Sequence, residues 1–285
     1  MLWVPQKGIL RVQHNLGNVG TTTLGTAATT GAASSTKGTP AQLLASTNFD
    51  SYWIKILASN YGSSATTSQC CVDIMIGGSG VEEVIIPDLL AGFCCAAGTT
   101  LGEGPKVWEF PLYIPANTRI SARAAGDRTS TAINVAVILY GGAGYPPFRV
   151  GSRILTYGIT TVPAGTDVTE GASGAEGSWT QITASTSEAH FAFVPSYHPT
   201  DGDTTLTPVK NVFVDLGFGA ATEELALGIE QSFVFRYGSG ELCDGPYNSI
   251  PIFQDLPAST RLVARASLSG AADTGPGDMA IHAVS

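Results

Sequence analysis

The sequence predicts an all-β protein built from two tandem antiparallel β-sandwich units of the jelly-roll-like kind, with an extended N-terminal arm. Three observations support this prediction. The segment PANTRISARA at 115–124 returns as PASTRLVARA at 257–266, with seven identical positions. Apolar and polar residues alternate with a period of two, which is typical of half-buried strands. Helical spacing is nearly absent, and Gly, Pro, Asn and Ser cluster between the alternating runs.

The repeated decapeptide is one of six matched blocks that occur in the same order in both halves. The blocks pair 25–33 with 165–173, 38–47 with 177–186, 72–77 with 214–219, 82–83 with 223–224, 115–124 with 257–266, and 135–140 with 279–284. A fixed order at a nearly constant separation indicates an internal duplication. The predicted organisation is therefore an arm at 1–36, a first sandwich at 37–145, a linker or arm at 146–176 and a second sandwich at 177–285.

The elements of the first sandwich follow from the period of two. Strands are expected at 52–57, 72–76, 83–86, 108–113, 118–124 and 132–138. In the expected strand 118–124, Ile120 shares a face with Ala122 and Ala124, whereas Arg119 and Arg123 face the other way. The duplication places Leu262 in the same interior position as Ile120. Residues 77–80 predict a turn, and residues 87–92 predict one short helical turn.

The arm is unusual because residues 12–36 contain no Asp, Glu, Lys or Arg. Disordered segments usually carry charge or proline. We therefore expect this stretch to lie extended against an open sheet edge, on its own sandwich or on another subunit. The alternative is a flexible linker. At the join between the units, the Gly-rich segment 141–147 ends in two prolines, which suits a connection.

The composition and the net charge of the chain exclude some classes of binding partner. Only 13% of the 285 residues are charged, which suits a chain whose surface is covered by other subunits. The net charge of -9 argues against nucleic acid or an anionic membrane as the main partner. No apolar run approaches the roughly 18 to 20 residues that span a bilayer, so membrane insertion is not expected. The N-terminus lacks the pattern of a secretory signal, which predicts assembly in the cytoplasm of the producing cell.

The residues that carry chemistry are scattered. The cysteines, at positions 70, 71, 94, 95 and 243, form no Cys-x-x-Cys pair. Cys70 and Cys71 align with Val212 and Phe213, which predicts packed small hydrophobes, with a disulfide or a metal as the alternatives. The four histidines are dispersed, and no phosphate loop or nucleophile elbow occurs. We therefore predict no catalytic residue, no metal site and no cofactor.

Acidic residues give weak signals. The pairs Glu82-Glu83 and Glu223-Glu224 put neighbouring side chains on opposite faces of a strand, which excludes joint acid–base work and predicts strand-edge charges. Asp201 and Asp203 have too few oxygen ligands nearby for a calcium loop.

Six residues are candidates for binding. Arg119 and Arg123 share one face, and Arg261 and Arg265 repeat them. These guanidinium groups either cover a solvated face, reach across a subunit boundary to the repeated Glu pair, or bind an anionic sugar. Trp179 and Tyr197, together with Tyr145, stand in loop-like contexts that suit a glycan platform or a protein interface.

Three blocks of the first unit, at 8–22, 38–50 and 82–92, resemble virion structural proteins of tailed bacteriophages. The resemblance covers most of the first unit and only the repeated blocks of the second. The second unit departs from it in the middle, where ALGIEQ at 226–231 stands against IPDLLA at 86–91. The resemblance implies an all-β particle component without enzymatic activity.

The predicted function is therefore a structural component of a tailed-phage virion, attached to the tail or baseplate or decorating the capsid as a spike. Its expected location is the virion, assembled in the host bacterial cytoplasm, with itself and other virion proteins as partners. A homotrimer of two-unit chains would present six similar sandwiches. The alternative is a module that binds a host-surface carbohydrate. A hydrolase would need a close carboxylate pair in a cleft, and the sequence nominates none.

Overall fold

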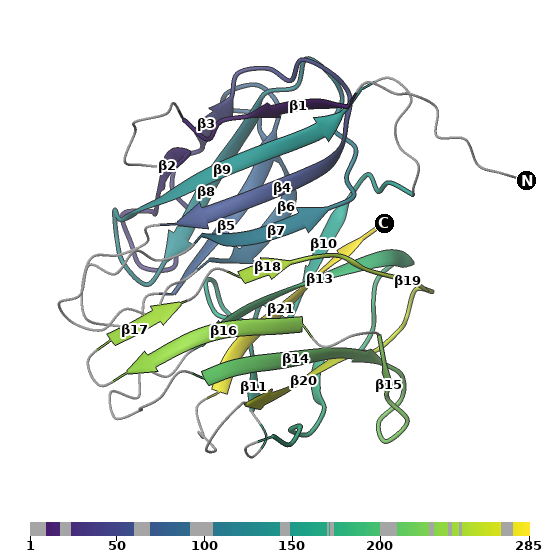
Figure 1. Cartoon of the computed structure of the whole chain (residues 1–285). Coiled ribbons are helices and arrows are strands. Elements are labelled where there is room, and N and C mark those ends of the chain that lie inside the picture. Colours follow the sequence, from purple (N-terminus) through teal and green to yellow (C-terminus); the bar gives the residue numbers. More distant parts are fainter. Residues whose placement is uncertain are drawn as a thin grey trace, which may run out of the picture.

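The computed structural model of the chain describes residues 10–17, 24–59, 69–91, 105–142, 149–169, 171, 174–199, 210–227, 231–238, 241–244, 247–268 and 276–285. These ranges contain β-strands and no helix, which confirms the predicted all-β class. Two halves lie one above the other, residues up to 142 in one and residues from 149 in the other (Figure 1). In the described part of the chain, no helix is long and apolar enough to cross a membrane.

The first unit is a sandwich of two sheets. Its strands are β1 (Arg11–His14), β2 (Thr26–Thr29), β3 (Ala41–Leu44), β4 (Ser51–Ser59), β5 (Cys70–Ile76), β6 (Glu83–Leu90), β7 (Lys106–Phe110), β8 (Ile120–Gly126) and β9 (Ala132–Gly141). Sheet 1a has the order β1-β9-β4-β7, with β2 also paired to β9, and sheet 1b has the order β3-β8-β5-β6.

The second unit repeats this arrangement and adds three short strands. Its strands are β10 (Ile154–Tyr157), β11 (Thr166–Thr169), β12 (Thr180–Thr183), β13 (His190–Pro199), β14 (Lys210–Phe218), β15 (Leu225–Ala226), β16 (Gln231–Gly238), β17 (Glu241–Asp244), β18 (Tyr247–Ser249), β19 (Ile252–Leu256), β20 (Leu262–Leu268) and β21 (Pro276–Val284). Sheet 2a has the order β10-β21-β13-β19, with β11 also paired to β21. Sheet 2b has the order β12-β20-β14-β16-β17, with β15 on β14.

The two halves therefore share one strand order, and equivalent positions have equivalent surroundings. Ile120 and Leu262 each begin the second strand of their sheet, and neither side chain is exposed. The turn before them explains the repeated decapeptide: Asn117 and Ser259 adopt positive φ values of 62° and 64°. Their amides donate to the carbonyls of Thr47 and Thr186 respectively. Duplication as the origin of this match stays a prediction.

The charge-free stretch near the N-terminus contributes β1 and β2, and both pair with β9 of the same unit. In the second unit, β10 and β11 pair in the same way with β21, within the segment 146–176. Pairing with a sheet edge satisfies the backbone donors and acceptors of these segments. The predicted short helical turn at 87–92 is wrong, because β6 continues through Leu90 and pairs with β5. The predicted turn at 77–80 is confirmed.

The units meet along the side of the first sandwich where β6 and β7 lie. The outward face of sheet 2a, carried by β10, β13 and β21, covers this side (Figure 1). Ala280 of β21 packs with Cys71, Leu90 and Ala125 of sheet 1b. In addition, β18 leaves the second unit and pairs in parallel with β7, which extends sheet 1a. The apolar core is continuous across this junction, so the two sandwiches form one packed body.

Candidate functional site

The arginines of the first unit lie on the outward face of sheet 1b. Arg119 Nη1 contacts Glu82 Oε1 at 2.7 Å, and its Nε donates to Gln42 Oε1 at 3.2 Å. Arg123 Nε donates to Asp73 Oδ2 at 2.8 Å across the β5–β8 pair. Charged hydrogen bonds of this length are among the stronger polar contacts in proteins. Both guanidinium groups are therefore held by carboxylates of their own unit.

The second unit repeats these contacts. Arg261 Nη1 contacts Glu224 Oε1 at 2.9 Å, and Arg265 contacts Asp215 Oδ2 at 2.8 Å. Within one chain, Arg119 and Arg261 therefore bind a glutamate of the repeated pair, and a contact across a subunit boundary stays a prediction. The alignment of the acidic pair is also corrected: Glu82 is equivalent to Glu224, since each receives the same guanidinium. The preceding turns match, because Gly77 and Gly219 both have positive φ, 113° and 120°, a backbone conformation that favours glycine.

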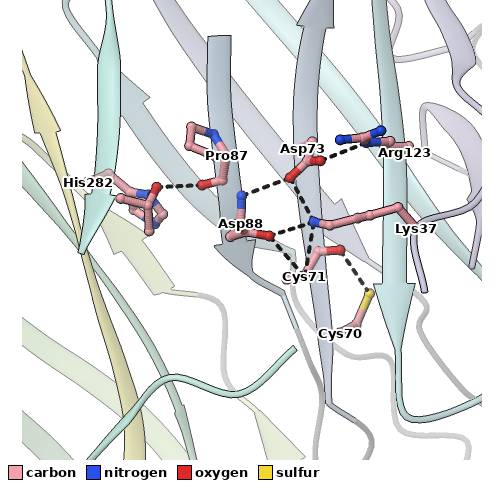
Figure 2. Close-up of polar contacts among 9 residues, drawn as sticks. Lys37, Cys70, Cys71, Asp73, Pro87, Asp88, Arg123 and His282 are labelled. Carbon is pink, nitrogen blue, oxygen red and sulfur yellow. Dashed lines mark hydrogen bonds and ion pairs between the residues drawn. The ribbon is translucent and has the colours of Figure 1, made fainter. Parts of the chain in front are cut away.

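A denser polar cluster surrounds Lys37, the residue that ends the charge-free stretch (Figure 2). Lys37 Nζ lies 2.7 Å from Asp73 Oδ1, 2.6 Å from Asp88 Oδ1 and 3.2 Å from Cys71 Sγ. The Asp88 amide donates to Asp73 Oδ1 at 2.9 Å, and Asp88 adopts a positive φ of 53°. Asp73 is 2% exposed, so this carboxylate is buried among its donors.

The electrostatics of this cluster keep Lys37 and Asp73 ionised near neutral pH. Burial alone would lower the pKa of Lys37, yet Cys71 and the two carboxylates outweigh it and raise that pKa. Burial alone would raise the pKa of Asp73, yet Lys37 and the donated hydrogen bonds lower it. Burial raises the pKa of the Cys71 thiol to about 12, although Lys37 opposes this. Lys37 and Asp73 thus stay ionised and Cys71 stays a thiol near neutral pH, so the cluster is suited to holding β5, β6 and the segment before β3 together.

The second unit fills the equivalent position with the opposite charge. Lys37 precedes Gly38, and Glu176 precedes the matching Gly177. Glu176 forms an ion pair with Arg265, which also bonds to Asp215. The Arg265 guanidinium lies 4.3 Å from the centre of the Trp179 ring, a cation–π distance. Each unit therefore neutralises this part of its sheet by a different set of side chains.

The two aromatic candidates for binding, Trp179 and Tyr197, differ in their exposure to solvent. Trp179 is partly exposed beside Arg265, as a binding residue requires. Tyr197 was expected in a loop, and that expectation is wrong: it lies in β13 and is 0% exposed. The continuous apolar run at 191–194 suits a strand that is buried on both faces, and it was the available signal. Tyr145, Asp201 and Asp203 lie outside the described residues.

A buried hydrogen-bond chain crosses the junction between the units. His282 Nε2 lies 2.6 Å from Ser196 Oγ, and His282 Nδ1 lies 2.8 Å from Thr156 Oγ1. Thr156 donates its one hydroxyl proton to the Pro87 carbonyl at 2.6 Å, so Nδ1 of His282 donates and Nε2 accepts. Burial lowers the pKa of His282 to about 3, which keeps the ring neutral. Ser196 and His282 are both 0% exposed, so the pair serves packing rather than substrate contact.

The chain predicts a measurable effect at the junction. Thr156→Val keeps the side-chain shape but leaves the Pro87 carbonyl and His282 Nδ1 without this partner. An unsatisfied buried polar group costs about 1–3 kcal/mol. We expect urea unfolding to show a loss of that size. Thr169→Val, at an exposed position of β11, should stay within about 0.5 kcal/mol of the parent. Equal effects of both substitutions would contradict the role of the chain.

A carboxyl pair lies on the same side of the second unit. Asp278 of β21 is opposite Asp167 of β11 and also opposite His198 of β13. Gln69 of the first unit donates to Asp278 Oδ2 at 2.8 Å. Burial raises the pKa of Asp278 to about 7, and the neighbouring Asp167 contributes to the increase. No sequence pattern predicted this pair, because only strand pairing brings the two residues together.

Cysteine and metal chemistry find little support in the described ranges. Cys70 and Cys71 are free and buried, as predicted from their alignment with apolar residues. Cys94 and Cys95 lie outside the described residues, and so does the side chain of Cys243. No group of three or more metal-ligating side chains occurs among the residues that the structure describes.

Fold and site together define a class: an all-β protein of two packed sandwich units whose described arginine and lysine clusters are neutralised internally. No family model matches the chain. No curated protein matches it in sequence.

Two crystal forms of PNGF-II are similar to the chain, each with 10% identity over 86% of it, with TM-scores of 0.34 and 0.37. The chain spans 58% and 59% of the length of those PNGF-II chains. The infectious bursal disease virus Gx strain structure is matched over 99% of this chain and 74% of its own, with 13% identity and a TM-score of 0.23. Likenesses this weak identify neither the topology nor the function.

Proposed function

We propose that the chain is a non-enzymatic structural component of a tailed-phage virion, acting at the tail or baseplate or as a capsid decoration or spike. The observation that carries this proposal is the junction of two sandwiches with one strand order into a single packed body. Such a body is a rigid building block with two similar surfaces. The resemblance of the blocks at 8–22, 38–50 and 82–92 to phage virion proteins gives the particle type.

Two further observations support a structural role. The candidate arginines and Lys37 are each bound to carboxylates of their own unit, which leaves these cations engaged in holding strands together. The whole sequence is only 13% charged, which suits a surface covered by neighbouring subunits in an assembly.

The test is imaging of particles that contain or lack this protein. We expect electron microscopy of the parent phage to show density that disappears when the gene is deleted and returns on complementation. A tagged copy should be labelled at the same place, on the tail, baseplate or capsid. Particles that are unchanged by the deletion and carry no labelled copy would reject the virion role.

Carbohydrate binding is the second candidate, and Trp179 is the observation that favours it. Its ring is partly exposed and lies beside Arg265, which is paired with Glu176, and both are polar groups suited to sugar hydroxyls. A glycan array would test it: binding by the parent chain that Trp179→Phe retains and Trp179→Ala abolishes would favour recognition. If the parent chain binds no glycan, carbohydrate binding is rejected and only the structural role remains.

An enzymatic alternative would depend on Asp278, whose pKa of about 7 suits a general acid. Against it stands the burial of this carboxyl, which is 2% exposed. The other close carboxylates, Asp73 and Asp88, are both bound to Lys37 and share its ammonium group. Turnover of a cell-wall or capsular polymer that Asp278→Asn abolishes would reject the non-enzymatic proposal.

A further inference from the structure

At the junction between the two units, the start of β10 contacts β6 of the first unit. Ser152–Leu155, at the start of β10, lie against Glu83–Ile85 and Pro87 of β6, and together they line a shared hollow. Ile154 is only 3% exposed there. The Thr156 hydroxyl adds its bond to the Pro87 carbonyl next to this contact. The edge strand of the second unit is thus docked on β6 of the first.

Both partners of this contact have an equivalent elsewhere in the chain. Val12 lies opposite Tyr140 in the β1–β9 pair, as Ile154 lies opposite Val284 in the β10–β21 pair. The segment 10–13 is therefore equivalent to 152–155. Because Glu82 is equivalent to Glu224, the segment 83–85 is equivalent to 225–227, which contains β15.

These equivalent segments expose apolar side chains. Leu10 is 50% exposed, Val12 is 49% exposed and Leu225 is 62% exposed. They are three of the seven large hydrophobic residues that stand exposed among the described residues. Val12 is thus open at a position where its counterpart Ile154 is covered. Exposed apolar groups gathered at two such segments are typical of interaction surfaces.

We propose that residues 10–13 of one copy pack against residues 225–227 of a second copy, repeating between chains the contact that β10 and β6 make within one. The charges agree with this pairing, since exposed Arg11 is next to Val12 and exposed Glu223 is near Leu225. This inference specifies how copies of the chain contact one another in the proposed structural role. It rests on that role only because it requires the chain to assemble.

The two surfaces differ, so the contact is head-to-tail. A head-to-tail contact generates a ring when its rotation closes and an open filament when it does not. Each added chain contributes two sandwiches, and a closed trimer would place six of them around one axis. The in-chain junction and the between-chain contact would then alternate around the ring.

The experiment is a charge exchange measured by light scattering. Val12→Glu places a carboxylate near Glu223, and Leu225→Arg places a guanidinium near Arg11, so each variant alone should dissociate the assembly. Combining both substitutions in one chain puts opposite charges in contact at every such interface and should restore association. Val81→Glu is the matched control, because Val81 is 78% exposed but lies in the turn between β5 and β6, away from both segments. Unchanged melting temperatures would show that all of these variants fold.

Each outcome decides the proposal. The proposal is supported if the parent chain is oligomeric, each single variant dissociates it, the double variant associates again and Val81→Glu leaves the assembly intact. An assembly that resists both variants overturns the proposed contact but leaves the virion role standing. A parent chain that stays monomeric at high concentration also overturns the contact. The imaging of particles still tests the virion role in that case.

Discussion

Asp73→Ala is expected to destabilise the protein by about 3–5 kcal/mol, the range for removing one partner of a buried ion pair. Asp73 is 2% exposed and accepts from Lys37, Arg123 and the Asp88 amide. Its loss leaves two cations without their shared carboxylate and the Asp88 amide without an acceptor. Chemical unfolding followed by circular dichroism would measure the change in the free energy of unfolding.

Asp215→Ala is the matched control for this prediction. Asp215 occupies the equivalent position in the second unit and is bound by Arg265. Arg265 keeps Glu176 as a second carboxylate partner when Asp215 is removed. The substitution should therefore cost less than Asp73→Ala. An equal or greater loss for Asp215→Ala would show that the Lys37 cluster contributes no special stability.

Asp278→Asn is expected to stabilise the protein at pH 8 and to remove part of its pH dependence. The pKa of Asp278 rises from an ordinary value of 3.8 to about 7 in the folded chain. A folded state that holds this proton more tightly gains stability below pH 4 and loses it progressively as the pH rises to about 7. The neutral amide escapes this loss. Its melting temperature at pH 8 should exceed that of the parent by roughly 5 °C, and the two should converge at pH 4.

The control for this prediction uses an exposed aspartate. Asp255→Asn removes the same charge at a side chain that is 81% exposed, and it should leave the difference between pH 4 and pH 8 unchanged. Asp167→Asn removes the neighbour that raises the pKa of Asp278, so it should give a partial effect. An Asp278→Asn variant whose pH profile parallels the parent's would contradict the buried, proton-binding carboxyl.

Local patterns explain why the fold was predictable. The alternation in 118–124 sends Ile120 to the core and Arg123 outward, and the structure has both there. Strand 72–76 was found in the same way. The predicted helical turn at 87–92 was wrong because local propensity was considered without the partner strand, whereas Leu89 and Leu90 pair with Val72 and Cys71 of β5. Tyr197 was misplaced for the same reason, since β21 and β19 enclose β13 on both sides.

The candidate site was less accessible to sequence reasoning. The arginines were identified, but the sequence left open whether they face solvent, a second subunit or a sugar, because their carboxylates lie far along the chain. Lys37 and Asp73 were not singled out, although two signals pointed to them. Lys37 ends a stretch without charge, and Asp73 stands alone between the apolar residues Val72 and Ile74. An isolated charge in a strand of this kind usually needs a partner when it is buried.

The sequence by itself determined six strands of the first unit, their inward faces and the repeated order of blocks, because a period of two and turn-forming residues act over a few neighbouring positions. The tertiary structure alone decided which charges meet. Lys37 reaches Asp88 across 51 residues, and Gln69 reaches Asp278 across 209. Such contacts depend on strand order and on the packing of one unit against the other. The junction also decided which equivalent surfaces are covered, burying Ile154 while leaving Val12 open.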